Sequence, residues 1–239
     1  MNRHPFYTLA AAFVLCLGLA ASHAQEKKTA EKKTAEKKTA EKKAEDWKPL
    51  FDGKTLEGWK PTDFGGRGEV TVAKGQIVLG AGSDITGVNY TREVPKTNYE
   101  VALEAMRVEG SDFMCGLTLP VGDAHFTFIA GGWGGGVVGI SSVNGDDASE
   151  NETTQIMKFD KGRWYKIRVR VTPEKIEAWI DNEQMVNLEL AGKTISMRAG
   201  EIEQSAPFGI ATYQTEAAFR DIKLRALPAA PDASHKSKK

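Results

Sequence analysis

Residues 164–171 read WYKIRVRV, with a large apolar residue at every second position from Tyr165 to Val171. This period of two predicts a β-strand that has one buried side and one side facing solvent. The same alternation continues in residues 176–181 and 185–190, and turn-forming residues separate the three segments. Together they predict three consecutive antiparallel strands.

Nine more segments on both sides of these strands have strand composition. They are residues 69–72, 76–79, 99–108, 113–119, 124–130, 137–143, 154–159, 208–213 and 219–224. No apolar pattern of helical period persists beyond about two turns, although residues 195–204 could hold one short helix. About a dozen strands in one domain predict an all-β fold, a two-sheet antiparallel β-sandwich of jelly-roll type, because that arrangement leaves few free strand edges.

The N-terminal residues 1–24 combine a basic start, an apolar run over residues 9–21 and small residues before position 25. This pattern predicts a cleaved signal peptide and therefore a secreted or periplasmic protein. An uncleaved anchor is the alternative, but the run is too short to span a bilayer, so we expect no membrane span after cleavage. Cys16 would leave with the signal, and Cys115, in an apolar strand, is expected to be a buried core residue.

Residues 25–46 repeat the sequence EKKTA, whose alanines spiral around a helix without forming an apolar stripe. We interpret this segment as a spacer, either a plain solvated tether or a contact to an anionic cell-envelope polymer. Residues 231–239 form a polar C-terminal tail. The domain between them, residues 47–230, carries 20 Lys and Arg against 25 Asp and Glu. Since no basic face with interleaved aromatic residues is visible, we expect no nucleic-acid partner.

Four segments resemble known families. Residues 161–186, which contain KGRWYKIRV and AWIDNEQMV, resemble a hairpin of concanavalin A-like and laminin-G-like sandwiches. The opening PLFDGKTLEGW of residues 49–59 resembles the 3-keto-disaccharide hydrolases, as do residues 75–78 and 219–224. The resemblance spans residues 47–227. It implies a jelly roll with a concave face that meets carbohydrate, and cleavage of glycosides oxidised at C3.

The chain departs from that family where many members carry Asn-Ser-Gly and GYExQ, because residues 111–117 read SDFMCGL and residues 125–129 read HFTFI. The family's polar site residues therefore do not transfer by position. A non-catalytic glycan-binding or cell-surface interaction module is the alternative function.

Cleavage of a 3-keto-glycoside by elimination needs a base for the C2 proton and a group that stabilises the enolate. His125 is the one histidine between residues 47 and 230, which makes it the candidate general base. The alternative is a strand histidine satisfied by local hydrogen bonds. A single histidine also excludes a multi-histidine metal site.

Sugar-binding candidates are aromatic and guanidinium side chains. Trp133 lies within GGWGGG at residues 131–136, where glycines allow close approach and an exposed indole can stack on a sugar ring. The same glycines could instead bend a sheet corner. The other candidates are Arg92, Arg107, Arg163 and Trp164. For each arginine a surface ion pair is the alternative to a clamp on sugar hydroxyls.

An acidic loop supplies the candidate metal ligands. They are Asp146, Asp147, Glu150 and Glu152. Hard carboxylate oxygens suit a divalent cation such as calcium or manganese, although the spacing is not that of an EF-hand, and a solvated acidic loop is the alternative. No other cofactor is expected.

Overall fold

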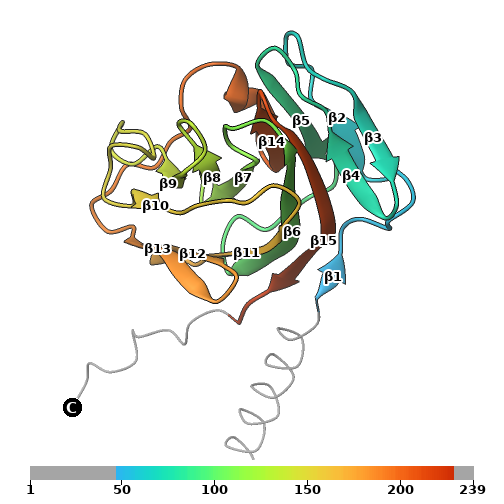
Figure 1. Cartoon of the computed structure of the whole chain (residues 1–239). Coiled ribbons are helices and arrows are strands. Elements are labelled where there is room, and N and C mark those ends of the chain that lie inside the picture. Colours follow the sequence, from blue (N-terminus) through green and yellow to red (C-terminus); the bar gives the residue numbers. More distant parts are fainter. Residues whose placement is uncertain (1–46, 229–239) are drawn as a thin grey trace, which may run out of the picture. The chain divides into compact units, whose positions relative to one another are not determined.

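The computed structural model describes residues 47–228, so the predicted signal peptide (1–24), spacer (25–46) and tail (231–239) lie outside the described residues. Within that range the chain forms two antiparallel sheets and one short 3-10 helix, η1 (Glu201–Ser205) (Figure 1). No helix in this range has the length and apolarity needed to cross a membrane. The predicted all-β, two-sheet jelly-roll sandwich is therefore confirmed.

Each sheet is assembled from strands that are distant in sequence. The eight-stranded sheet has the order β13 (Glu183–Glu189), β12 (Lys175–Ile180), β11 (Trp164–Val171), β6 (Tyr99–Glu109), β15 (Glu216–Ala226), β4 (Gln76–Leu79) and β3 (Val70–Ala73), with β1 (Lys48–Pro49) paired to β15. The seven-stranded sheet has the order β10 (Gln155–Ile156), β9 (Val137–Ser141), β8 (Ala124–Gly132), β7 (Cys115–Val121), β14 (Gly209–Tyr213), β5 (Ile85–Tyr90) and β2 (Trp59–Pro61).

The three strands predicted first form β11, β12 and β13, and they pair in that order. Three strands escaped the sequence analysis, namely β1, β2 and β5. The first two are very short and each contains a proline, and β5 interrupts its apolar residues with Gly87 and Asn89, so neither length nor alternation marks them. The short helix expected within residues 195–204 is reduced to η1, and the rest of that segment is irregular.

The core lies between the two sheets. Tyr165, Ile167 and Val169 of β11 are buried there, as the alternation predicted. Cys115 of β7 has no exposed surface and belongs to the same core, which confirms that it is a buried residue. Burial also raises the pKa of the Cys115 thiol, so the reactive thiolate does not form at neutral pH.

The opposite side of the eight-stranded sheet carries an ion cluster around Glu100 on β6. Arg168 and Arg170 of β11 donate to its Oε1 at 2.8 and 2.7 Å, and Arg225 of β15 pairs with its Oε2. The Glu100 side chain is 0% exposed beneath these arginines. Burial alone would raise the pKa of Glu100, but the hydrogen bonds and charges of Arg170 and Arg225 hold it below its ordinary value.

Replacing Glu100 with glutamine is expected to lower the free energy of unfolding by about 2 kcal/mol at neutral pH, because three guanidinium groups lose their shared carboxylate. A carboxyl whose pKa is lowered by folding stabilises the protein above its unfolded pKa, and this contribution disappears as the pH falls through the folded pKa. The difference between wild type and Glu100→Gln should therefore shrink on acidification below about pH 4. Urea unfolding at several pH values measures it, and a difference that stays constant with pH would contradict the assignment.

From the sequence we expected no basic face with interleaved aromatic residues, and the structure shows that this expectation was wrong. Basic and aromatic residues do gather on this side of the eight-stranded sheet: the Arg168 guanidinium lies 3.6 Å from the ring centroid of Trp179, and that of Arg220 lies 4.0 Å from the centroid of Trp164. Net charge did not reveal the arrangement, because β15 and β6 are distant in sequence from the consecutive strands β11 and β12 and contribute to the same surface only after pairing.

Candidate functional site

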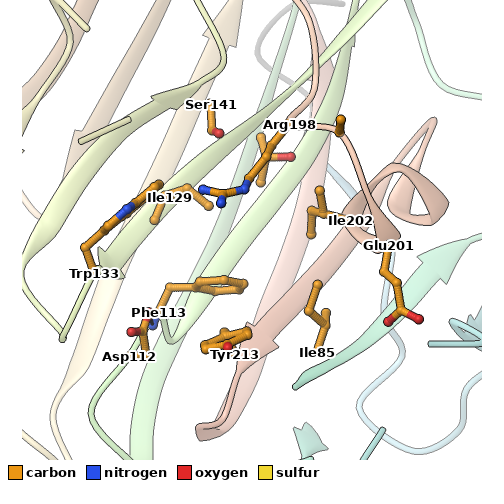
Figure 2. A pocket seen from close by; sticks show the side chains of 12 residues that line it. Ile85, Asp112, Phe113, Ile129, Trp133, Ser141, Arg198, Glu201, Ile202 and Tyr213 are labelled. Carbon is orange, nitrogen blue, oxygen red and sulfur yellow. Dashed lines mark hydrogen bonds between the residues drawn. The ribbon is translucent and has the colours of Figure 1, made fainter. Parts of the chain in front are cut away.

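A cavity of about 380 Å³ lies on the side of the seven-stranded sheet that faces away from the core (Figure 2). Thr127 and Ile129 of β8, Ser141 of β9 and Tyr213 of β14 line it from the sheet. These residues alternate along their strands with core residues, so their side chains point outward. On another side, Arg198 of the irregular segment before η1 and Glu201 and Ile202 of η1 itself line the cavity.

Aromatic side chains form much of the cavity wall. The rings of Phe113 and Tyr213 lie stacked, with centroids 5.9 Å apart and planes 29° apart. Desolvation and the nearby carboxylates of Asp84 and Asp112 raise the pKa of Tyr213, so its hydroxyl stays protonated at neutral pH and can donate a hydrogen bond. Apolar area with a few polar groups is typical of small-molecule sites.

Trp133 stands at the rim of this cavity with 42% of its surface exposed, and Figure 2 shows its indole across from Ile202 and Ile85. Its backbone has a φ of 47°, a left-handed conformation uncommon for a bulky residue. Asp112 holds the next residue by accepting the Gly134 N–H on Oδ2 at 3.0 Å. Trp133, the residue predicted to stack on a sugar, therefore lies at a cavity, on a loop that is held in its conformation by hydrogen bonds from outside the loop.

Arg107 of β6 holds the loop of residues 131–136, which carries Trp133, from its buried side. Its guanidinium donates to the carbonyl oxygens of Phe159, Asp112, Gly131 and Gly135, at 2.9–3.3 Å. A Cβ on Gly131 would lie 2.6 Å from this guanidinium, so the close approach requires glycine there. Arg107 is only 5% exposed and does not line the cavity. Arg107 lies beneath the Trp133 loop. The prediction that it binds sugar hydroxyls is therefore wrong, because its side chain is buried and does not reach the cavity.

Arg198 brings a positive charge to the cavity, and the sequence analysis did not single it out. Its guanidinium extends toward Trp133, with Cζ 6.0 Å from the ring centroid (Figure 2). Nη1 also pairs with Oδ2 of Asp147 at 2.6 Å. The backbone is anchored two residues earlier, where Ser196 and Ser142 exchange N–H···O bonds of 2.6 and 3.2 Å. Arg198 thus retains N–H donors for a ligand that rests on the indole.

The four acidic residues predicted to bind a cation do not converge. Asp147 accepts hydrogen bonds from Ser141 and Ser142 on Oδ1 and pairs with Arg198 through Oδ2. Glu152 pairs with Lys193 at 2.5 Å, and Asp146 and Glu150 are exposed. Between residues 47 and 228, no three carboxylate, imidazole or thiol groups are arranged to hold a metal ion. These donors therefore do not fit a calcium or manganese site.

His125, the predicted base, lies on β8 opposite Pro120. The strand alternation places it on the same face as Thr127 and Ile129, but it does not line the cavity. Burial and the charge of Lys96 lower the pKa of His125, so its imidazole is neutral at neutral pH.

The remaining predicted sugar contacts lie elsewhere. Arg92 pairs with Glu57 at 2.7 Å and lines a separate pocket of about 530 Å³ beside β2 and β5. Arg163 pairs with Asp181 at 2.7 Å, and Trp164 lies under Arg220, both on the eight-stranded sheet side. The structure therefore brings only Trp133 of the predicted sugar-binding set to the cavity.

The domain is a jelly-roll sandwich that carries an aromatic-lined cavity on the outer side of one sheet, an architecture that includes lectin domains among others. Residues 46–225 match the family described as the 3-keto-alpha-glucoside-1,2-lyase-like domain. The chain belongs to this family, as the opening segment at residues 49–59 suggested. The sequence matches no protein of curated function.

Solved structures of similar shape are also found. One is a putative glycosyl hydrolase from Parabacteroides distasonis, with 15% identity, a TM-score of 0.49, and coverage of 79% of this chain and 97% of that chain. Another is the carbohydrate-binding module CBM66 from Bacillus subtilis, with 9% identity, a TM-score of 0.47, and coverage of 71% and 96%. A third is the carbohydrate recognition domain of Emp46p, with 14% identity, a TM-score of 0.48, and coverage of 78% and 98%.

Proposed function

We propose that this domain, in an exported protein, binds a 3-keto-glycoside in the cavity between Trp133 and the segment leading into η1. The observation that carries the proposal is the pairing of an exposed indole with a guanidinium 6.0 Å away, at the mouth of a cavity lined by aromatic side chains. A sugar ring presents C–H groups to an indole face and hydroxyls to a guanidinium edge. The cavity volume also falls within the range of about 300–1,000 Å³ found for small-molecule sites.

Cleavage of the bound glycoside is the reaction that family membership supports. A base removes the proton from C2, and the electron pair forms the enolate of the C3 ketone. The bond from C1 to the leaving oxygen then breaks as a C1=C2 double bond forms, and the leaving oxygen takes up the proton that the base removed. Water adds across that bond to complete a net hydrolysis. We assign the role of base to Glu201, because both oxygens of Asp112, the other carboxylate that lines the cavity, accept backbone N–H groups. Glu201 stands at the edge of the cavity opposite Trp133, beyond Ile202 and Ile85 (Figure 2), and its carboxylate is exposed.

Binding without cleavage is the second candidate. It is favoured by the position of His125 outside the cavity and by the engagement of Asp112, whose two carboxylate oxygens accept the N–H groups of Phe113 and Gly134. In this alternative Asp112 has a structural role, because it holds the Trp133 loop, and the cavity binds the sugar without cleaving it.

Incubation of the protein with 4-nitrophenyl 3-keto-α-glucoside separates the two. An active enzyme releases 4-nitrophenolate, and Glu201→Gln is expected to slow release at least about 100-fold because a catalytic base contributes roughly that factor. The matched control is Glu203→Gln, a neighbouring carboxylate of η1 that does not line the cavity. No release together with saturable binding of methyl 3-keto-α-glucoside selects the binding module. No release and no binding would contradict both candidates.

A further inference from the structure

The solvent-facing side of the eight-stranded sheet, which we call the arginine face, gathers cationic and aromatic side chains apart from the cavity. Three of the five tryptophans of the chain lie on it. The face consists of Trp47, Trp164, Trp179, Lys166, Arg168, Arg170, Arg220, Lys223 and Arg225, with Glu100 and Glu104 beneath them.

Its charges are arranged in two levels. The carboxylates of Glu100 and Glu104 form the lower level, since their side chains are 0% and 17% exposed, whereas Asp221 is 58% exposed beside Lys223. The guanidinium groups form the upper level, with Arg170 and Arg220 at 35% and 42% exposure. Apart from the exposed carboxylate of Asp221, solvent and any molecule arriving from it therefore meet positive charge first, although the domain as a whole is acidic.

The positive groups are also held in place. Arg168, Arg170 and Arg225 each bond to the same buried carboxylate, and the first also lies against the ring of Trp179. A guanidinium has five N–H donors, so bonding to Glu100 leaves others directed elsewhere. Because these side chains are already ordered, little rotamer entropy is lost when they bind an anion. We propose that the arginine face binds a linear anionic polysaccharide through its carboxylate or sulfate groups.

Two features favour this partner over other polyanions. Among residues 47–228 the exposed large hydrophobic side chains are Trp133 and Ile156, and neither lies on the arginine face, so no apolar group is available to insert into an anionic membrane. Base stacking on single-stranded nucleic acid needs open aromatic rings. One face of Trp179 and one of Trp164 are occupied by arginine. What the face offers is a fixed array of guanidinium donors, which suits repeated carboxylate or sulfate groups.

The test is titration of the full protein with heparin and with polygalacturonate at low ionic strength. Saturable binding is expected to at least one of them, weakening as salt is raised because exposed charges are screened. The double variant Lys166→Glu/Lys223→Glu should weaken binding at least about tenfold, since it reverses two charges on the face while sparing the bonds to Glu100.

The matched control is Lys60→Glu/Lys96→Glu, which makes the same change in net charge on the seven-stranded sheet side. Like Lys223 with Asp221, Lys96 is paired with a neighbouring carboxylate, Asp123. We expect this control to bind within about twofold of wild type, since its charges are far from the face. The proposal is overturned by an absence of binding to both polysaccharides, by an equal loss in the control, or by tighter binding to oligo(dT) or phosphatidylglycerol vesicles. Because Trp133→Ala should leave this binding unchanged, the result is independent of the cavity.

Discussion

Replacing Arg107 with methionine is expected to lower the free energy of unfolding by about 2–4 kcal/mol, since buried carbonyl groups lose their donors. Four carbonyl oxygens depend on this one guanidinium, including those of Gly131 and Gly135 in the Trp133 loop. Methionine matches much of the volume but offers no N–H group. The measurement is urea unfolding followed by tryptophan fluorescence.

The control for this prediction is Arg163→Met. Arg163 also packs over an aromatic ring, with Cζ 4.4 Å from the centroid of Tyr165, but it is exposed and pairs with a carboxylate at the surface. We expect a loss below about 1 kcal/mol there, because exposed ion pairs contribute little. Equal stability of the two variants would show that the carbonyl cluster does not depend on Arg107.

Replacing Trp133 with alanine is expected to weaken the binding of methyl 3-keto-α-glucoside about 10–100-fold, because an aromatic platform that stacks on the ligand commonly supplies that share of affinity. Stability should change little, since the indole is well exposed. Isothermal titration calorimetry gives the affinity. Trp164→Ala, on the other sheet, is the matched control and should bind like wild type; a similar loss in both variants would refute the cavity as the binding site.

The fold could be predicted because strand alternation is a local property of the sequence. The alternation from Tyr165 to Val171 is enough to predict which side of that strand is buried, and no information from other segments is needed. The alternation does not say which strands pair, however. Trp164 was correctly placed on a solvent-facing side, but that side belongs to the sheet opposite the cavity.

Residues of the cavity were harder to predict. Arg198 lies in an irregular segment and Glu201 begins the one-turn helix η1 that follows it, so neither belongs to a periodic pattern. Tertiary hydrogen bonds such as those between Ser196 and Ser142 bring that segment to the sheet. The buried position of Arg107, by contrast, could have been predicted from the sequence. It shares the strand phase of Leu103 and Ala105, which point into the core, and an arginine at an inward position must find several hydrogen-bond acceptors.

The central claim is that a saccharide binds against Trp133. Two-dimensional NMR of the indole N–H groups tests it most directly, because each of the five tryptophans gives its own signal. On titration with methyl 3-keto-α-glucoside, the account predicts a saturable shift of the Trp133 signal while those of Trp164 and Trp179 stay in place. A Trp133 signal that does not move while the sugar binds, or a shift confined to the other two, would contradict it.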